Sequence, residues 1–261
     1  MSDPLGGIPE AWRGRLRRAA MPAWIEPMRA TLHHDAFSDP DWIYERKLDG
    51  VRALAFREGG RVTLRSRNRK DLGQTFPELV EALEGQPKGD FVADGEIVTF
   101  RGQVTSFERL QGRLGIGDPA KARSSGIAVS LYLFDLPYLH GVDLRRLPLR
   151  ARKGVLERGF DFGRRLHYTP HRNEHGEAWL AEACRKGWEG LIAKHAGSGY
   201  ESRRSKQWLK LKCARRQEMV IGGYTDPQGS REHFGALLVG YYENGDLRYA
   251  GKVGTGYDAD L

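Results

Sequence analysis

A lysine set among acidic and basic neighbours is the first sign of chemistry in this chain. Residues 45–52 read Glu-Arg-Lys-Leu-Asp-Gly-Val-Arg, which puts Lys47 two residues after Glu45 and five before Arg52. A lysine that loses its proton becomes a nucleophile, and basic neighbours can hold the phosphate that it attacks. The pattern therefore indicates covalent attack by Lys47 on a nucleotide. The competing interpretation is an exposed hairpin turn with ordinary charges, and the motif alone does not exclude it.

Other charged segments can supply what a nucleotide needs: donors for the phosphates, an acid for the ribose, an apolar wall for the base and a divalent metal. Several of these segments read as strands, in which side chains two residues apart point to the same face. Three pairs share a face in this way: Glu45 with Lys47, Asp94 with Glu96, and Lys210 with Lys212. Pairs near strand ends can converge on one ligand.

The order of these segments resembles that of the covalent nucleotidyltransferases, which include ATP-dependent DNA ligases, RNA ligases and mRNA capping enzymes. Lys-x-Asp-Gly-x-Arg at Lys47 is the nucleophile motif of that superfamily. The form Glu-Gly-Leu-Ile-Ala-Lys at 189–194 favours DNA ligases, and the details look closest to the ligase domain of bacterial DNA ligase D. The other matching segments are Ser-Arg-Asn at 66–68, Asp-Gly-Glu-Ile-Val at 94–98, Leu-Phe-Asp at 133–135 and Trp-Leu-Lys-Leu-Lys at 208–212.

The resemblance implies a role for each motif residue. Lys47 would attack the α-phosphate of ATP and carry AMP as a phosphoramidate, and Glu189 and Asp49 would bind the divalent metal, Mg²⁺ or Mn²⁺. The implied nucleotide contacts are those of Glu45 and the Arg46 backbone with adenine, Phe134 and Ile192 with the two faces of the base, Glu96 with the ribose hydroxyls, Arg52 and Arg67 with ribose and phosphates, and Lys210 and Lys212 with the α-phosphate.

The composition fits a soluble protein with an anionic partner. The chain has 261 residues, with 42 basic and 34 acidic side chains, so its formal net charge is +8. Such a surface favours a phosphate backbone. Apolar runs are too short for a membrane span, and the N-terminus has no secretory signal. Cys184 and Cys213 predict neither a disulfide framework nor a zinc site. We expect a cytoplasmic, nucleoid-associated monomer of a bacterium or archaeon.

The pattern of apolar residues predicts a mixed α+β fold. Residues 1–40 read as irregular, and residues 41–56 read as two strands joined at Gly50. Strands at 91–93 and 97–100 flank the acidic turn Asp94-Gly95-Glu96. Further expected elements are helices at 105–114, 149–158 and 177–186, and strands at 128–135, 190–194 and 207–212.

We expect two domains of different size. Residues 1–213 would form a nucleotidyltransferase (ATP-grasp-like) adenylation domain of antiparallel sheets with flanking helices, and residues 214–218 a hinge. Residues 219–261 would be the N-terminal part of an OB-fold barrel, incomplete because 43 residues are too few for five strands with loops. The last basic motif of the family is then missing, which predicts a protein that binds ATP but self-adenylylates poorly.

The predicted function is ATP-dependent sealing of nicks with a 5′-phosphate and a 3′-hydroxyl, in double-strand-break end joining. The implied partners are nicked double-stranded DNA, a Ku-like end-binding protein, and polymerase or phosphoesterase domains of a longer parent chain. Two alternatives stay open. One is an RNA ligase or a capping-type enzyme, which RNA-only sealing or GTP use would reveal. The other is a nick-binding fragment that never carries AMP.

Overall fold

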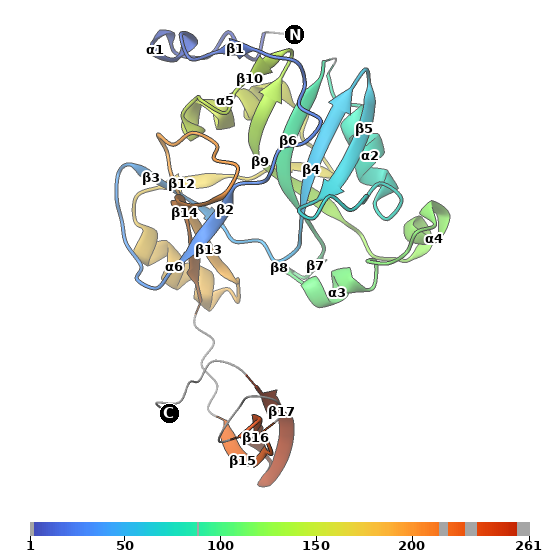
Figure 1. The fold of residues 1–261 in the computed structure, drawn as a ribbon, viewed down its shortest axis with the longest axis vertical. Helices are drawn as coiled ribbons and strands as arrows, with labels where there is room; N and C mark the ends of the chain where they lie inside the picture. Colours follow the sequence, from blue (N-terminus) through green and yellow to red (C-terminus); the bar gives the residue numbers. More distant parts are fainter. Residues whose placement is uncertain (1–2, 88, 214–218, 228–233, 255–261) are drawn as a thin grey trace. The chain divides into compact units, whose positions relative to one another are not determined.

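The computed structural model describes residues 3–87, 89–213, 219–227 and 234–254 (Figure 1). The chain divides into two compact units, residues 1–213 and residues 214–261. The hinge predicted at 214–218 lies outside the described residues. No helix among the described residues combines the length and the apolar character needed to cross a bilayer.

A seven-stranded sheet is the larger half of the first unit, as far as its residues are described. Its order is β1-β10-β9-β6-β4-β5, and β11 pairs in parallel with β9. The remaining pairs are antiparallel. The strands are β1 (Arg17–Arg18), β4 (Val51–Glu58), β5 (Arg61–Ser66), β6 (Phe91–Val98), β9 (Ser130–Leu139), β10 (Val142–Asp143) and β11 (Leu166–Tyr168).

A five-stranded sheet forms the second half of this unit in the described residues. Its order is β12-β3-β13-β14-β2, and β2 runs parallel to β14. The helix α6 packs against β13, while α5 packs against β9 of the larger sheet. The elements are β2 (Arg29–His33), β3 (Trp42–Arg46), β12 (His171–Asn173), β13 (Gly190–His195), β14 (Arg204–Lys212), α5 (Leu149–Gly159) and α6 (Gly176–Arg185).

Smaller elements cover the larger sheet and its ends. The helix α2 contacts β5 and β4, and Pro77 at its first position has a φ that suits a helix start. The side chain of Asp118 caps the backbone N–H groups at the start of α4. These elements are α1 (Glu10–Arg13), α2 (Pro77–Glu84), α3 (Phe107–Gln111), α4 (Pro119–Ser124), β7 (Phe100–Arg101) and β8 (Val104–Thr105).

The alternation along β4 explains how the two sheets pack. Ala53 and Ala55 belong to the core on the helix-covered side of the larger sheet, whereas Leu54 and Phe56 belong to a core that also contains Trp208 of β14. A strand with apolar residues on both faces is buried on both faces. The second core therefore lies between the sheets, and Arg52, two residues before Leu54, points to the same side.

The second unit contains a three-stranded antiparallel sheet in its described residues. It is built from β15 (Val220–Thr225), β16 (Ala236–Glu243) and β17 (Asp246–Val253). Asn244 and Gly245, which connect the last two strands, have φ of 53° and 90°. Positive φ at both central residues is the type I′ geometry that Asn-Gly predicts. No barrel closes within residues 219–227 and 234–254.

The mixed α+β class and the sheet-rich architecture are confirmed, and three local predictions are wrong. The two strands expected around Gly50 are present as β3 and β4, although they belong to different sheets. Asp94-Gly95-Glu96 is not a turn, because β6 runs through it without a break. The first 40 residues contain α1, β1 and β2, and the helix expected at 105–114 is the shorter α3. For the strands, pairing with distant segments decides the structure, and a local pattern does not encode that pairing. The helix α3 ends at Gln111, with Gly112 as its C-cap.

The prediction that Cys184 and Cys213 form no disulfide framework is also wrong. Cys184 in α6 and Cys213 after β14 form a disulfide between residues 29 positions apart. Two cysteines this far apart give no spacing signal, because a fold rather than a motif brings them together. The bond links α6 to the end of β14. Both elements contribute to the buried cluster that contains Leu191 and Leu211.

Candidate active site

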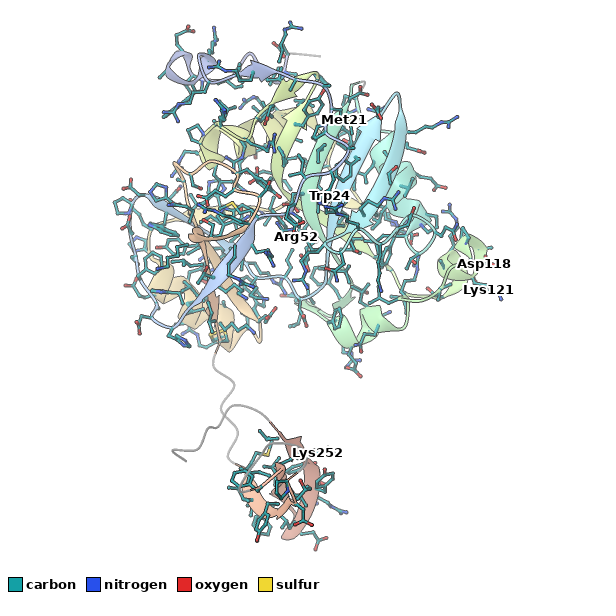
Figure 2. The ribbon with its side chains drawn as sticks, viewed as in Figure 1. Met21, Trp24, Arg52, Asp118, Lys121 and Lys252 are labelled. Carbon is teal, nitrogen blue, oxygen red and sulfur yellow. A yellow bond between two sulfur atoms is a disulfide. The ribbon has the colours of Figure 1, made fainter. Side chains whose placement is uncertain are left out.

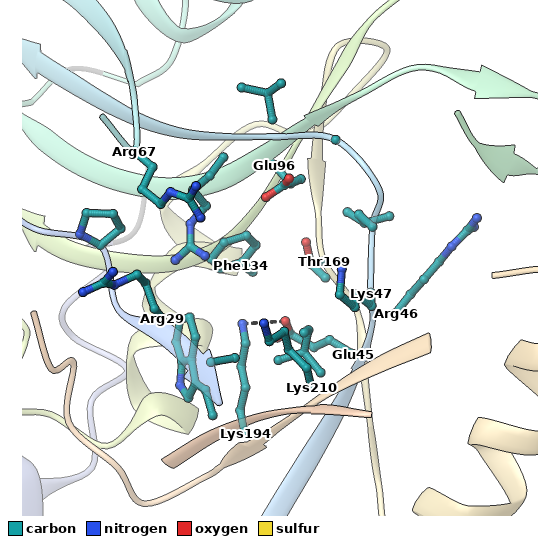
Figure 3. Close-up of a pocket in the computed structure, with 18 of the residues that line it drawn as sticks. Arg29, Glu45, Arg46, Lys47, Arg67, Glu96, Phe134, Thr169, Lys194 and Lys210 are labelled. Carbon is teal, nitrogen blue, oxygen red and sulfur yellow. Dashed lines mark ion pairs between the residues drawn. The ribbon is translucent and has the colours of Figure 1, made fainter. Parts of the chain in front are cut away.

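A cavity of about 450 Å³ opens in the first unit where the two sheets meet (Figure 3). Its wall combines side chains of β3, β13 and β14 with side chains of β4, β6 and β9. Nine of the twelve residues predicted from the sequence line it: Glu45, Arg46, Lys47, Arg52, Arg67, Glu96, Phe134, Ile192 and Lys210. The volume lies in the range of ligand pockets.

Lys47 lies in the connection by which the chain leaves β3 and enters β4. Its backbone N–H donates to the Gly190 carbonyl at 2.9 Å, and its ammonium group forms an ion pair with Glu189. Gly50 follows in the same connection, where an added Cβ would lie 2.1 Å from the Ile97 carbonyl oxygen. Only glycine lets this connection approach β6 so closely, and that approach holds Lys47 at the cavity wall.

One part of the cavity wall carries an ionic cluster beside aromatic rings. Glu45 is buried, and its two carboxylate oxygens each lie 2.6 Å from a lysine, Lys153 and Lys194. Burial alone would raise the pKa of Glu45, but the charges of the two lysines outweigh it and lower that pKa. Lys194 also lies 4.2 Å from the centre of the Phe134 ring and 4.1 Å from that of Trp208. Burial lowers the pKa of Lys194 to about 8.

Arg52 and Glu96 stand side by side on β4 and β6, at paired positions. Arg52 donates to both carboxylate oxygens of Asp94, at 2.5 and 2.6 Å, and lies 4.5 Å from the centre of the Phe134 ring. Asp94 also accepts from Tyr200 at 2.6 Å. These contacts hold the guanidinium in one orientation at the cavity wall. Burial raises the pKa of Glu96 to about 7, although Arg52 and Lys47 act to lower it.

Cations surround the rest of the cavity. Arg29 of β2 and Arg67, in the turn after β5, approach from the side opposite Lys47 (Figure 3). Arg204 and Lys210 of β14 complete the set. Burial lowers the pKa of Lys210, and the charges of Arg204 and Lys47 add to this effect. Several positive charges around one cavity attract a ligand with several phosphates.

Three predicted residues are not part of the cavity wall. Glu189 contacts Lys47, and Lys212 approaches the same carboxylate at 3.7 Å. Asp49 is separate, because its backbone N–H donates to the Thr105 hydroxyl and its side chain is not among those that line the cavity. The described residues contain no group of three or more His, Cys, Asp or Glu side chains suited to a metal ion. Mg²⁺ needs only one or two carboxylates when phosphates share it, so the small number of carboxylates near Lys47 is compatible with such a metal.

Sequence reasoning missed several residues of the site. Arg29, Thr169, Lys194, Arg204 and Trp208 line the cavity. Lys194 and Trp208 stood inside recognised motifs, so they were open to prediction, whereas Thr169 gave no local signal. Lys153 lies behind the cavity wall. The sequence feature that could have identified it is a charged residue in the buried stripe of α5, beside Val155 and Leu156. A cation in such a stripe needs a buried partner.

Three residues of the cavity wall carry a buried polar atom that makes no hydrogen bond in the structure. Trp208 Nε1, Thr169 Oγ1 and Arg29 Nε are buried without a hydrogen-bond partner in the structure. Buried polar groups are rarely left unpaired in proteins. The cations around the cavity, the carboxyl group of Glu96 and the Phe134 ring together fit a purine nucleotide.

Comparison with protein families gives two matches. The family described as "ATP dependent DNA ligase domain" matches residues 27–212, and "ATP dependent DNA ligase C terminal region" matches residues 230–261. A curated relative, the multifunctional non-homologous end joining protein LigD of Pseudomonas aeruginosa, is 42% identical over 249 residues. These residues cover 93% of this chain and 29% of LigD, so the chain spans under a third of that relative.

This chain covers a larger share of some shorter relatives and solved structures. DNA ligase C1 of Mycolicibacterium smegmatis is 34% identical, covering 88% of this chain and 68% of the relative. The structure titled mycobacterial DNA ligase D complexed with ATP and MES has a TM-score of 0.63 and 32% identity, covering 89% of this chain and 73% of that chain. The ligase domain of LigD from M. tuberculosis has a TM-score of 0.62 at 33% identity, covering 90% and 74%.

Proposed function

Because this chain belongs to the ATP-dependent DNA ligase family, we propose that it joins nicked DNA by carrying AMP on Lys47. One observation carries the proposal. The amine of Lys47 stands at the wall of a cavity that offers cations for phosphates, an acid for ribose and an aromatic ring for a base. The motif resemblance and the family membership point to the same chemistry.

The first step forms a bond between the Lys47 nitrogen and the α-phosphorus of ATP. The bond from that phosphorus to the β-phosphate oxygen breaks, and pyrophosphate leaves. Lys47 must shed a proton to attack, and its ion pair with Glu189 has to open. Lys210, with a pKa lowered by burial, and Arg67 would balance the charge that develops on the phosphate.

Two further transfers complete the reaction. The 5′-phosphate of the nick attacks the α-phosphorus, and the nitrogen–phosphorus bond breaks, so that Lys47 regains its amine. The 3′-hydroxyl then attacks the 5′-phosphate and expels AMP, which forms the new phosphodiester. A divalent metal, held through Glu189, would supply charge stabilisation for phosphoryl transfer. Glu45, Phe134 and Ile192 would bind adenine, and Glu96 the ribose.

We extend the proposal to the biological setting and to the domains. Relatives named for non-homologous end joining support a role in double-strand-break repair, with a Ku-like protein and further catalytic domains as partners. Residues 1–213 would be the adenylation domain, and residues 219–261 part of an OB-fold. A cytoplasmic location close to the nucleoid fits such a role. The Cys184–Cys213 disulfide is unusual for a reducing compartment.

The intact mass of the purified chain tests the proposal. After incubation with ATP and Mg²⁺, a fraction of the wild type should gain the mass of one AMP, a small one if self-adenylylation is as poor as the sequence predicts, and Lys47→Ala should gain none. The matched control is Lys121→Ala, because Lys121 projects from α4 at the periphery of the first unit (Figure 2) and should label like the wild type. Labelling by GTP in place of ATP would indicate a capping-type enzyme. ATP binding without any AMP adduct would favour the alternative of a nick-binding fragment that never carries AMP.

A further inference from the structure

Lys153 is a buried lysine that none of the recognised motifs contains. Its side chain is 1% exposed, and its ammonium group donates to Glu45 Oε1 at 2.6 Å and to the Thr169 carbonyl at 2.9 Å. It also lies 4.5 Å from the centre of the Tyr168 ring. Lys153 does not line the cavity. Any effect that it has on a ligand must therefore pass through its partners Glu45 and Thr169, which both line the cavity, and Glu45 is the one that it holds by its side chain.

Glu45 is held from two elements at once. Lys153 of α5 binds one carboxylate oxygen, and Lys194 of β13 binds the other. One anchor would leave the carboxylate free to turn about its last bond, but two anchors on opposite oxygens fix its plane. An ionised carboxylate only accepts hydrogen bonds and has about four acceptor sites. Because Glu45 lines the cavity, the acceptor sites left over are available to a ligand there.

A carboxylate with a fixed orientation can distinguish adenine from guanine. Adenine carries an exocyclic amino group that donates, whereas guanine has a carbonyl oxygen at the same place. A carboxylate accepts from the first and repels the second. An acceptor discriminates best when it cannot turn away, because a group left unpaired in a buried site costs affinity.

We propose that Lys153 is a positioning residue that locks the Glu45 carboxylate as the acceptor for the exocyclic amino group of adenine, so that the cavity selects ATP. The inference rests on the proposed function, since it takes ATP as the ligand and Glu45 as its adenine contact. Without Lys153, the carboxylate follows Lys194 alone and loses its alignment. Lys153 thus sets base selectivity from behind the wall, without touching the nucleotide.

Calorimetry with two ligands tests the proposal on the whole 261-residue chain. The ligands are ATP and purine riboside 5′-triphosphate, which lacks the amino group and keeps everything else. The wild type should prefer ATP by about tenfold or more, the range of a hydrogen bond to a charged group. In Lys153→Met this preference should fall below about threefold, through weaker ATP binding, while the affinity for purine riboside triphosphate changes little.

Three further variants separate positioning from simple damage to the fold. Lys153→Arg keeps the charge and the donors and should restore most of the preference. Lys153→Gln keeps a neutral donor, and it decides the question if Lys153→Met does not fold. Arg113→Met is the matched control, because Arg113 is equally buried and pairs with Glu78 away from the cavity. It should lower stability and leave the preference for ATP unchanged.

Equal losses for both ligands in Lys153→Met and Lys153→Gln would overturn the proposal, and so would an unchanged ratio. Failure of the proposed function gives a different result. A wild type that prefers ATP but never carries AMP on Lys47 would contradict the ligase chemistry, and the affinity ratio would still decide the role of Lys153. A wild type that binds neither triphosphate would overturn both.

Discussion

The carboxyl group of Glu96 should make nucleotide binding depend on pH near neutrality. Glu96 stands in the cavity wall beside Arg52, and burial raises its pKa to about 7. A carboxyl group with a raised pKa is protonated below that value and ionised above it. Ribose hydroxyls donate hydrogen bonds, and an ionised carboxylate accepts them more strongly than a neutral acid does. Binding through the ribose should therefore strengthen as the pH rises.

The size of the effect follows from the pKa. With a value near 7, about one tenth of Glu96 is ionised at pH 6 and about nine tenths at pH 8. If only the ionised form binds the hydroxyls, the affinity gained from them should rise about tenfold over this range. The matching stability effect has the opposite direction. Because the folded pKa is raised, Glu96 stabilises the empty protein below its unfolded pKa and loses this contribution as the pH rises through 7.

Two ligands isolate the ribose contribution in the assay. The affinity of ATP is compared with that of 2′,3′-dideoxy-ATP by calorimetry at pH 6, 7 and 8. Titration of the triphosphate, of Lys194 and of Lys210 affects both ligands alike and cancels in the ratio. The ratio should rise about tenfold in the wild type and stay flat in Glu96→Gln. The reasoning is refuted if the ratio is flat in the wild type or rises equally in the variant.

Three other perturbations have defined outcomes. Reduction of the Cys184–Cys213 bond should lower the free energy of unfolding by about 3 kcal/mol, because the bond closes a loop of 29 residues; denaturant unfolding should show no effect of dithiothreitol on the double serine variant. Arg152→Met should cost about 3–5 kcal/mol in urea unfolding, because it leaves the buried carboxylate of Asp135 unpaired, and adding Asp135→Leu should recover most of the loss. Gly50→Ala should slow AMP transfer to the protein while circular dichroism stays native, since its Cβ would collide with a carbonyl oxygen of β6; labelling at the wild-type rate would contradict this.

Local pattern was enough to predict the strands and the face on which their side chains lie. In β4, the alternation of Ala53 and Ala55 with Leu54 and Phe56 matches the two cores on its two sides. The same parity places Glu45 and Lys47 along one wall of the cavity. Parity depends only on the geometry of an extended chain, so it holds without knowledge of the partner strands.

Strand partners were beyond the reach of the sequence. The segments around Gly50 look like a hairpin, yet β3 pairs with β12 and β13, whereas β4 pairs with β5 and β6. The choice depends on segments far along the chain, such as β13, which pairs with β3 in the smaller sheet. For the same reason the position of Lys153 in the buried stripe of α5 does not identify its partner, because Glu45 lies 108 residues away.

The separate strand partners of β3 and β4 explain the position of Lys47. A hairpin would have put Lys47 at an exposed turn between two paired strands. Because β3 and β4 belong to different sheets, the connection that carries Lys47 crosses from one sheet to the other. One wall of the cavity then comes from each sheet, with Glu45 and Lys210 on the first and Arg52 and Glu96 on the second. A small change in the packing of the two sheets would move these walls relative to Lys47. The core between the sheets, which includes Phe134 and Trp208, therefore aligns the groups that bind the nucleotide with the amine that attacks it.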